Sequence, residues 1–250
     1  MSLLQEKLSI VVCSKSDYSG LISTLKSLNS LEADLPQIIL VLSGYSETDL
    51  ERIKSKFASL KIDLVHISPQ GIYSAQNLGL RKVKNRLVLF LNGGDALANP
   101  FGLDLLITQI GENPWGYGEI DLVEINSIHS KRYRFSYIEL CHRLGLKYVP
   151  HPATVIDAQQ AIRYGGFDEN YTSAADHKLL LMFSRESSPI VVKTLISTFY
   201  RGGVSSRNQV DIVKDCKNIS RELFGYFFRN RFLDSLIWSA VLIIRKILKG

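Results

Sequence analysis

Four short apolar runs in the first 92 residues constrain the fold of this chain more than any other feature. The runs cover residues 8–13, 37–42, 62–67 and 86–92. Helical patterns with apolar residues on one face separate them, at residues 21–28, 48–60 and 75–83. Buried strands that alternate with amphipathic helices are typical of a mostly parallel sheet covered by helices on both faces. We therefore predict an α/β fold.

Polar residues follow several of these runs, at the points where the strands should end. In an open parallel sheet the ligand binds in the crevice beyond the carboxyl ends of the strands. The predicted topology places Ser14 with Lys15, Ser43, the segment near Gly71, and residues 92–95 around one such crevice.

The fourth apolar run ends in FLNGGD, which puts a carboxylate just beyond a strand. Asn92 ends the run, two glycines free the backbone, and Asp95 follows. A carboxylate in this place suits a hard divalent cation that also binds phosphate oxygens. An Asp that caps the next short helix is equally consistent with the pattern. Both interpretations of Asp95 stay open.

Two further segments carry small or charged residues at the start of predicted helices. In GIYSAQNLGL, Gly71 and Asn77 are consistent either with a close approach of the backbone to a ligand or with tight packing of a helix on the sheet. In GGFDENYTSAADHKLLL, Asp176 precedes an apolar run, which is typical of a helix cap or of a solvated charge. If Asp176 faces the crevice that holds Asp95, it is instead a candidate general base.

Taken together, these segments resemble the family 2 glycosyltransferases of the GT-A fold, in the branch that acts in bacterial polysaccharide and O-antigen assembly. The resemblance covers about residues 7–205, in the order of that family. It rests on the segments LSIVVCSKS, GIYSAQNLGL, FLNGGD, HPATVI, GGFDENY and AADHKL. The fold implied is a GT-A, Rossmann-like domain over residues 1–206, followed by a helical extension over residues 207–250.

The resemblance implies an inverting transfer of a sugar from a nucleotide-diphosphate donor, linked to UDP, GDP or dTDP, to a hydroxyl of a lipid-linked glycan. Asp95 would hold Mg²⁺ or Mn²⁺ against the diphosphate, and Asp176 would accept the proton of the attacking hydroxyl. The other site residues implied are Ser14, Ser43, Gly71, Asn77, Asn92 and Gly94 around the donor, and His151 and Gly166 on the acceptor side.

Three positions depart from the pattern of the family. Ser43, Gln70 and Ser74 stand where family members often carry an Asp. The loss of these carboxylates suggests an alternative, a catalytically weakened member that acts as a nucleotide-sugar or glycan-binding module. Turnover of a donor would separate this alternative from a transferase.

The C-terminal fifth accounts for the whole net positive charge of the chain. The formal net charge is +6, and residues 201–250 hold ten Lys or Arg against four Asp or Glu. From Ile219 onward, apolar residues at helical spacing alternate with basic ones, and Trp238 is of the type found at membrane interfaces. This extension is expected either to lie on an anionic membrane surface or to pack on the preceding domain or a partner. Its basic residues are Arg221, Arg229, Arg231, Arg245, Lys246 and Lys249.

Other classes of protein are excluded or poorly supported. The longest apolar stretch, residues 232–244, is short of the roughly 20 residues of a spanning helix. Three scattered cysteines and no secretory signal pattern indicate a cytoplasmic protein, placed on the inner face of the membrane if the extension binds there. No Gly-x-Gly-x-x-Gly follows the first run, which argues against a dinucleotide oxidoreductase. The basic residues accompany an apolar helix, which argues against nucleic acid as a partner.

Overall fold

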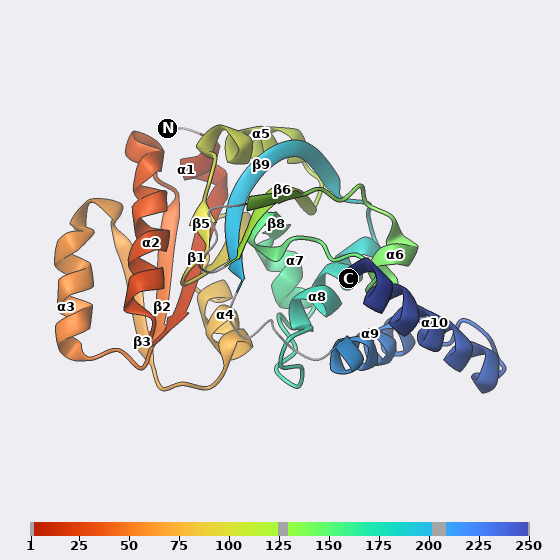
Figure 1. The fold of residues 1–250 in the computed structure, drawn as a ribbon. Coiled ribbons are helices and arrows are strands. Elements are labelled where there is room, and N and C mark those ends of the chain that lie inside the picture. The colour runs from red at the N-terminus through yellow and green to blue at the C-terminus, as the bar shows by residue number, and fades with distance from the viewer. Residues whose placement is uncertain (1–2, 125–129, 202–208, 250) are drawn as a thin grey trace.

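A nine-stranded sheet organises the computed structural model, which describes residues 3–124, 130–201 and 209–249 (Figure 1). The strands are β1 (Leu8–Lys15), β2 (Gln37–Ser43), β3 (Ile62–Ile67), β4 (Leu87–Asn92), β5 (Ala96–Leu97), β6 (Trp115–Glu124), β7 (Ser130–Tyr133), β8 (Thr154–Asp157) and β9 (Ile190–Arg201). Their order is β3-β2-β1-β4-β8-β6-β9-β5, with β7 paired to β6.

The direction of the strands confirms the predicted, mostly parallel sheet. β1 pairs in parallel with β2 and β4, and β2 with β3. β8 is antiparallel to both β4 and β6, so β6 and its parallel neighbour β9 run in the direction of β4. In the described part of the chain, the strands that run the other way are β5, β7 and β8.

Ten α-helices accompany the sheet in the described residues. They are α1 (Leu3–Lys7), α2 (Tyr18–Leu28), α3 (Glu47–Lys56), α4 (Ile72–Leu80), α5 (Pro100–Ile110), α6 (Glu139–Arg143), α7 (Ala158–Arg163), α8 (Ala175–Ser184), α9 (Gln209–Phe224) and α10 (Arg231–Lys249). Polar side chains begin the early helices, since Asp17 caps α2 and Ser46 forms a capping box with Asp49 at α3. Short 3-10 turns cover Asn29–Asp34, Ala58–Leu60 and His151–Ala153.

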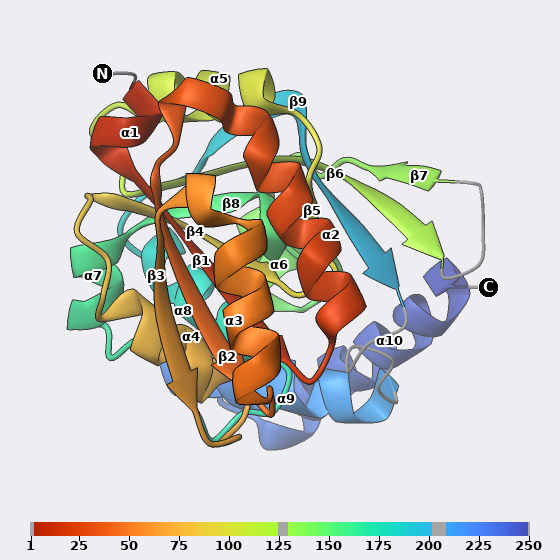
Figure 2. The same cartoon turned by 90° about the vertical axis from the view of Figure 1, so that its left-hand side faces the viewer.

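The helices cover both faces of the sheet, as predicted. Ile10 and Val12 of β1 point into a core formed with α2, α3 and α5. Val11 and Cys13 point into a second core formed with α4, α7 and α8. This alternation follows from the two-residue period of a strand. Figure 2 shows α2 and α3 lying over the first face.

The elements after residue 100 are less evident from the sequence. α5 begins with Pro100 in its first turn, and β6 crosses the sheet with a sequence that mixes glycines, aromatic residues and acids. Gly118 is required in β6 because a Cβ there would lie 2.4 Å from Cγ1 of Ile196 in β9. Because glycine is needed for this close packing, β6 lacks the continuous apolar run that marks the earlier strands.

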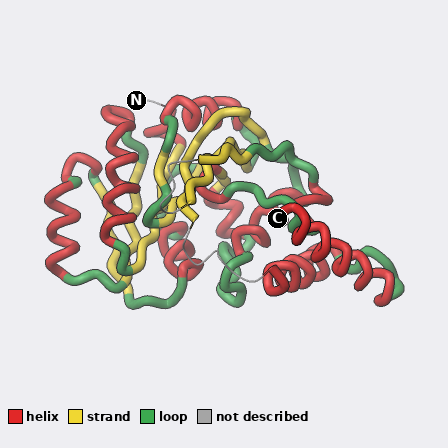
Figure 3. The backbone as a smooth tube through the Cα atoms, in the orientation of Figure 1, coloured by secondary structure: helices red, strands yellow, loops and turns green. Residues whose placement is uncertain are grey.

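The C-terminal helices α9 and α10 form a lobe beside α6 and α8 (Figure 3). The predicted boundary at residues 206 and 207 lies outside the described residues. The prediction that Trp238 lies at a membrane interface is wrong. Trp238 is 3% exposed and packs with Leu144, Val213 and Cys216, because it occupies the face of α10 that contacts the rest of the lobe.

Two of the six basic residues that the sequence analysis assigns to the C-terminal extension also form contacts within the protein. Arg221 pairs with the buried Asp234, with 3.0 Å between Nε and Oδ2. Arg245 is buried and donates to the hydroxyl of Tyr148 at 3.0 Å. Across the described ranges, no helix combines the length and apolar character needed to span a membrane.

Candidate active site

The ends of β1, β2 and β4 bring several of the predicted donor residues to one edge of the sheet. Lys15 is in register with Ser43, and Cys13 is in register with Asn92. The N–H of Gly93 donates to the carbonyl of Cys13 at 2.8 Å, which holds the turn after β4 against β1. Ser14 lies next to that turn, so Ser14, Ser43 and Asn92 border the same region, as the parallel register requires.

The turn from Asn92 to Asp95 depends on its two glycines. A Cβ on Gly93 would lie 2.4 Å from Oγ of Ser14, and Gly94 has a φ of +106°, which favours glycine. The N–H of Gly94 donates to Oγ1 of Thr24 in α2 at 3.0 Å. These contacts fix the position of Asp95 at the end of the strand.

Asp95 is buried, with an exposed fraction of 3%. Its Oδ2 accepts a hydrogen bond from the N–H of Asn92 at 2.8 Å. Burial raises the pKa of Asp95 to about 7, against the smaller opposing effect of that hydrogen bond. The cap interpretation is wrong, because β5 follows Asp95 and the N-cap of α5 is Asn99.

Asp95 and Asn92 are the side chains here with the oxygen atoms that Mg²⁺ or Mn²⁺ prefers. A Cβ on Gly94 would meet no atom within 4 Å, so there is open space beside the turn. Within the described ranges, no group of three or more His, Cys, Asp or Glu has the arrangement of a metal site. The turn thus offers one carboxylate, that of Asp95, and a cation bound there would have to take most of its other ligands from a bound molecule.

A second polar group lies between α4, α8 and the 3-10 turn before β8. The hydroxyl of Tyr73 donates to Oδ1 of Asp176 at 3.2 Å. Asp176 is the second residue of α8, whose N-cap is Ala174. The cap interpretation of Asp176 is therefore wrong, and its carboxylate faces the hydroxyl of Tyr73 in α4.

Gln76 connects this second group to the end of β4. Its Nε2 lies 3.4 Å from Oδ1 of Asn92 and 3.4 Å from Nε2 of His151. Its Oε1 is buried and has no hydrogen-bond partner among the described residues. Asn92, beside the candidate metal ligand, is thus joined through Gln76 to His151.

His151 borders the same small cavity as Asp176. The imidazole stacks on Phe90, with 5.7 Å between ring centroids, and meets the edge of Phe167 at 5.7 Å. Burial lowers the pKa of His151, and the charge of Asp176 opposes that effect. The cavity of about 10 Å³ is lined by His151, Phe90, Phe167 and Asp176, among others. His151 is therefore held neutral at neutral pH, close to the candidate base.

Asn77 and Gly166 meet each other, although the sequence analysis assigns them to different sides of the site. Nδ2 of Asn77 donates to the carbonyl of Phe167 at 2.8 Å and to Oε1 of Glu169 at 2.9 Å, and its Oδ1 accepts from the N–H of Phe167 at 2.8 Å. A Cβ on Gly166 would lie 2.4 Å from Oδ1 of Asn77. The Asn77 amide thus holds the turn after α7 on α4.

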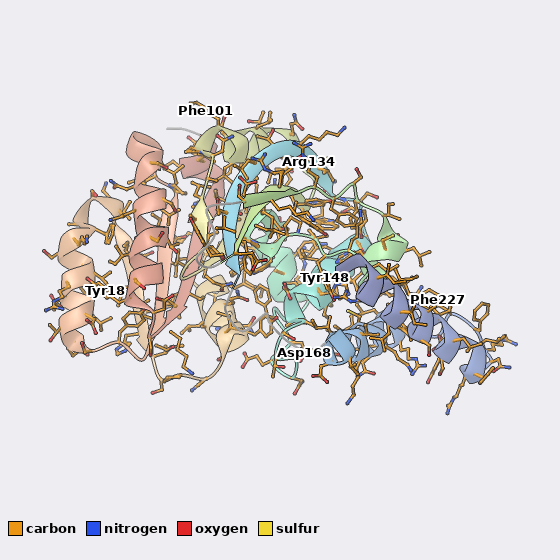
Figure 4. All side chains as sticks on the ribbon, viewed as in Figure 1. Tyr18, Phe101, Arg134, Tyr148, Asp168 and Phe227 are labelled. Carbon is orange, nitrogen blue, oxygen red and sulfur yellow. The ribbon has the colours of Figure 1, made fainter. Side chains whose placement is uncertain are left out.

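That turn borders a larger pocket of about 440 Å³ between α8 and α9. Lys178 lines this pocket, with Nζ 2.6 Å from Oδ2 of Asp168 and 2.5 Å from Oε1 of Glu222 in α9. Figure 4 labels Asp168 beside α9. Gly79, two residues after Asn77, packs directly on the sheet, because a Cβ there would lie 2.3 Å from Cγ1 of Val11.

Sequence reasoning missed Tyr73 and Gln76, which connect the two groups of the site. Both lie in the motif GIYSAQNLGL, three residues apart, and residues at this spacing share a face of a helix. Gly71, at the N-terminus of the same helix, has a φ of +109° and open space around it.

No model of a protein family matches the chain. Two curated relatives, from two strains of Mycobacterium tuberculosis, are each named an uncharacterized glycosyltransferase. Each is 24% identical over 214 residues, which cover 82% of this chain and 79% of the relative.

Solved structures share the architecture at low sequence identity. TarS of S. aureus, residues 1–349 in complex with UDP-GlcNAc, matches 95% of this chain and 72% of its own at a TM-score of 0.69 and 15% identity. The mannosyltransferase PcManGT of Pyrobaculum calidifontis, in complex with GDP-Man and Mn²⁺, matches 82% of this chain and 60% of its own at a TM-score of 0.60 and 12% identity. The fold is GT-A-like.

The match to the neighbours is partial in length. The chain spans 44% of a longer TarS structure, at a TM-score of 0.63. The GT-A-like fold places the ends of β1, β2 and β4 on the side where an open sheet of this kind binds its ligand. Fold alone does not carry function, so the activity of this chain is argued from its own residues.

Proposed function

We propose that this chain is an inverting glycosyltransferase, which moves a sugar from a nucleotide-diphosphate donor to a hydroxyl of a glycan acceptor. The observation that carries the proposal is the pair of carboxylates at the carboxyl edge of the sheet, Asp95 after β4 and Asp176 at the start of α8. Asp95 accepts from the backbone N–H of Asn92, whose side chain is linked through Gln76 to His151. His151 borders the same small cavity as Asp176, and Tyr73 donates to Asp176. The names of the relatives and the bound donors of the neighbours support the same class of reaction.

The donor binds at the strand ends in this proposal. Ser43 and Asn92 supply hydroxyl and amide groups to the nucleotide, and Gly71 and Gly94 leave room for it. Ser14 borders the same strand ends, with its hydroxyl 2.6 Å from the hydroxyl of Tyr45. A UDP-, GDP- or dTDP-linked sugar has the matching chemistry of hydrogen-bonding groups next to phosphates. Ser43 carries no charge where an Asp is common, so we expect the donor to be held mainly by neutral hydrogen bonds.

Asp95, with Asn92 beside it, would hold a divalent cation such as Mg²⁺ or Mn²⁺. When bound, the ion neutralises the charge that develops on the leaving diphosphate. Asp95 must be ionised to bind it, and a cation offsets the cost of that charge in a buried position. The Mn²⁺ in the neighbouring mannosyltransferase is consistent with this assignment.

Asp176 acts as the general base in this mechanism. One carboxylate suffices, because inversion is a single displacement: the acceptor oxygen forms its bond to the anomeric carbon as the bond to the diphosphate breaks. The proton of the acceptor hydroxyl moves to Asp176, and Tyr73 orients that carboxylate through its hydrogen bond. His151 and the turn at Gly166 lie on the acceptor side, and Asn77 holds that turn in place.

We further propose that the acceptor glycan is lipid-linked, and that the chain works on it at the cytoplasmic face of the membrane. The positive charge of residues 201–250 supports contact with an anionic surface on that side.

The test is release of nucleoside diphosphate from a panel of UDP-, GDP- and dTDP-sugars in the presence of Mn²⁺ and extracted lipid-linked glycans. Release from one donor is expected for a transferase. Tight binding of a donor without any release would favour the alternative function, a nucleotide-sugar-binding module, which the replacement of Asp by Ser43, Gln70 and Ser74 would explain.

A further inference from the structure

The outward face of α10 carries large apolar side chains that remain exposed in the described part of the chain. Phe232, Leu236, Ile243 and Ile247 are 69%, 49%, 60% and 71% exposed. Their spacing of four, seven and four residues places them on one stripe of the helix. We call these four residues the outer face of α10.

The opposite face of α10 is already used to attach the helix to the protein. Trp238 and Val241 are buried in the lobe with Val213 and Cys216, and Asp234 pairs with Arg221. The fold of the chain therefore accounts for one apolar face of α10 and leaves the other exposed. A helix that is apolar on two sides requires a second covering surface.

The segment before α10 extends this surface. Tyr226 and Phe228 are 48% and 47% exposed, and Arg229 and Arg231 are exposed beside them. The guanidinium carbon of Arg231 lies 5.9 Å from the ring centroid of Tyr226. Aromatic rings and arginines thus alternate at the start of the outer face of α10.

Charge indicates what covers the surface. Arg229 and Arg231 are exposed at the start of the outer face, and the one acidic residue of 223–250, Asp234, is buried and paired with Arg221. An apolar stripe with basic residues at its edge matches the boundary between acyl chains and anionic headgroups. Two copies of α10 packed on each other would bring these basic segments together, which disfavours a second copy of this chain.

We propose that the outer face of α10, with Tyr226 and Phe228, docks on a membrane that contains anionic phospholipid. The helix lies parallel to the membrane plane, its apolar stripe enters the headgroup region, and Arg229 and Arg231 contact lipid phosphates. The inference deepens the proposed function and depends on it for its purpose, since a lipid-linked acceptor shares that surface. Figure 1 shows α10 at the end of the molecule farthest from α2 and α3.

The experiment is cosedimentation of the full chain with vesicles of phosphatidylcholine alone or mixed with phosphatidylglycerol. The wild type is expected to bind the anionic vesicles and to release them as salt is raised. Leu236→Glu with Ile243→Glu is expected to weaken that binding at least about 10-fold, because charges enter the apolar stripe. Arg229→Gln and Arg231→Gln are each expected to weaken it about 5-fold.

The matched control is Phe101→Glu with Leu105→Glu, which places the same charges on exposed apolar positions of α5. This control is expected to bind vesicles as the wild type does. Circular dichroism of each variant establishes that it is folded.

Three results would overturn the proposal: no binding of the wild type to anionic vesicles, unchanged binding by the α10 variant, or equal loss in the α5 control. A dimer in lipid-free solution that the α10 substitutions dissociate would overturn it in favour of an interface between two copies. Nucleotide-sugar binding is measured in parallel, without vesicles. Failure of the proposed function abolishes only that second signal, so the two failures are distinguishable.

Discussion

Two carboxylates carry the proposed chemistry, and they lie in different surroundings. Asp95 is buried in a glycine turn, with its carboxylate directed to the N–H of Asn92. Asp176 is partly exposed at the start of α8 and accepts from Tyr73. The buried environment of Asp95 suits a carboxylate whose charge is offset by a bound cation. The partly exposed environment of Asp176 suits a group that exchanges a proton with a substrate.

Asp95→Asn is expected to abolish the effect of Mn²⁺ on donor binding. The amide preserves the shape and the hydrogen bond from Asn92, but it lacks the charge that attracts the cation. In the wild type we expect Mn²⁺ to tighten donor binding by at least about 10-fold, as measured by titration calorimetry. The assignment of Asp95 is contradicted if Mn²⁺ tightens donor binding equally in the variant.

Asp176→Asn is expected to retain donor binding and to lose transfer. The amide cannot accept the proton of the acceptor hydroxyl, and a general base contributes about 10²- to 10⁴-fold to the rate. Product formation at saturating donor is the measurement, with donor affinity as its control. Wild-type turnover by this variant would remove Asp176 from the role of base.

Gln76→Leu is expected to lower kcat by about 5- to 30-fold, with a smaller effect on the KM of the donor. Leucine is close in size to glutamine but cannot bond to Asn92 or His151, and each hydrogen bond contributes on the order of 1 kcal/mol. Gln159→Leu, on the exposed side of α7, is the matched control. If the two variants have the same kcat, Gln76 does not position the site.

The residues of the site were only partly predictable. FLNGGD and AADHKL marked Asp95 and Asp176, because glycine turns and helix starts are visible in the sequence. The contact of Asn77 with the turn after α7 joins residues 90 positions apart, and only the fold brings them together. Gln76 looked like an ordinary helical residue because its partners come from distant segments.

At the scale of elements, the turn between α7 and α8 connects the site to its support. Gly165 and Gly166 have φ values of +89° and +74°, so both favour glycine. They differ in their surroundings: a Cβ on Gly165 meets nothing within 4 Å, whereas one on Gly166 meets the Asn77 amide. Substitutions at Gly165 and Gly166 therefore distinguish the cost of backbone strain from the cost of a clash with Asn77.

Gly166→Ala is expected to lower the free energy of unfolding by more than Gly165→Ala does. Both variants carry the cost of a left-handed residue, on the order of 1 kcal/mol, and only the first also displaces Asn77. We expect the difference to be about 1–2 kcal/mol, because the hydrogen bonds of the displaced amide are weakened. Urea denaturation measures it, and equal losses would show that the Asn77 contact does not stabilise the turn.

Elements with strong periodicity were predicted well. The first four strands and the helices between them lie within a few residues of their predicted bounds. Near-continuous apolar runs that alternate with amphipathic helices are compatible with few structures other than buried strands. α5 and β6 were not recognised. The glycines that let β6 approach β9 interrupt the apolar pattern on which strand prediction depends.

At the scale of the whole molecule, a buried group of aromatic and titratable side chains joins α6 to α8, and its Tyr148 contacts Cys216 and Arg245 of the C-terminal lobe. The imidazoles of His142 and His177 meet at 4.8 Å between centroids, and Tyr148 lies 5.4 Å from His177. Both ring nitrogens of His177 lack a hydrogen-bond partner among the described residues. The pKa of His177 is lowered to about 4, mainly by burial; the charge of Asp176 opposes this shift and that of Arg245 adds to it.

This depressed pKa makes the cluster of His142, Tyr148 and His177 sensitive to acid. The unfolded chain binds a proton at His177 near pH 6.5 and the folded chain only near pH 4, so stability falls as the pH decreases through that interval. His177→Phe keeps an aromatic ring and removes the titration. We expect its melting temperature to fall less than that of the wild type between pH 7 and pH 4.5, and parallel decreases would contradict the assignment.

The central claim is that the strand ends of this chain form a nucleotide-sugar site that works with a divalent cation. Its most direct test is calorimetric titration of the purified full chain with UDP-, GDP- and dTDP-sugars, with and without Mn²⁺. We predict that one class of donor binds and that Mn²⁺ tightens its binding. Absence of binding by every donor, with and without Mn²⁺, would contradict the claim.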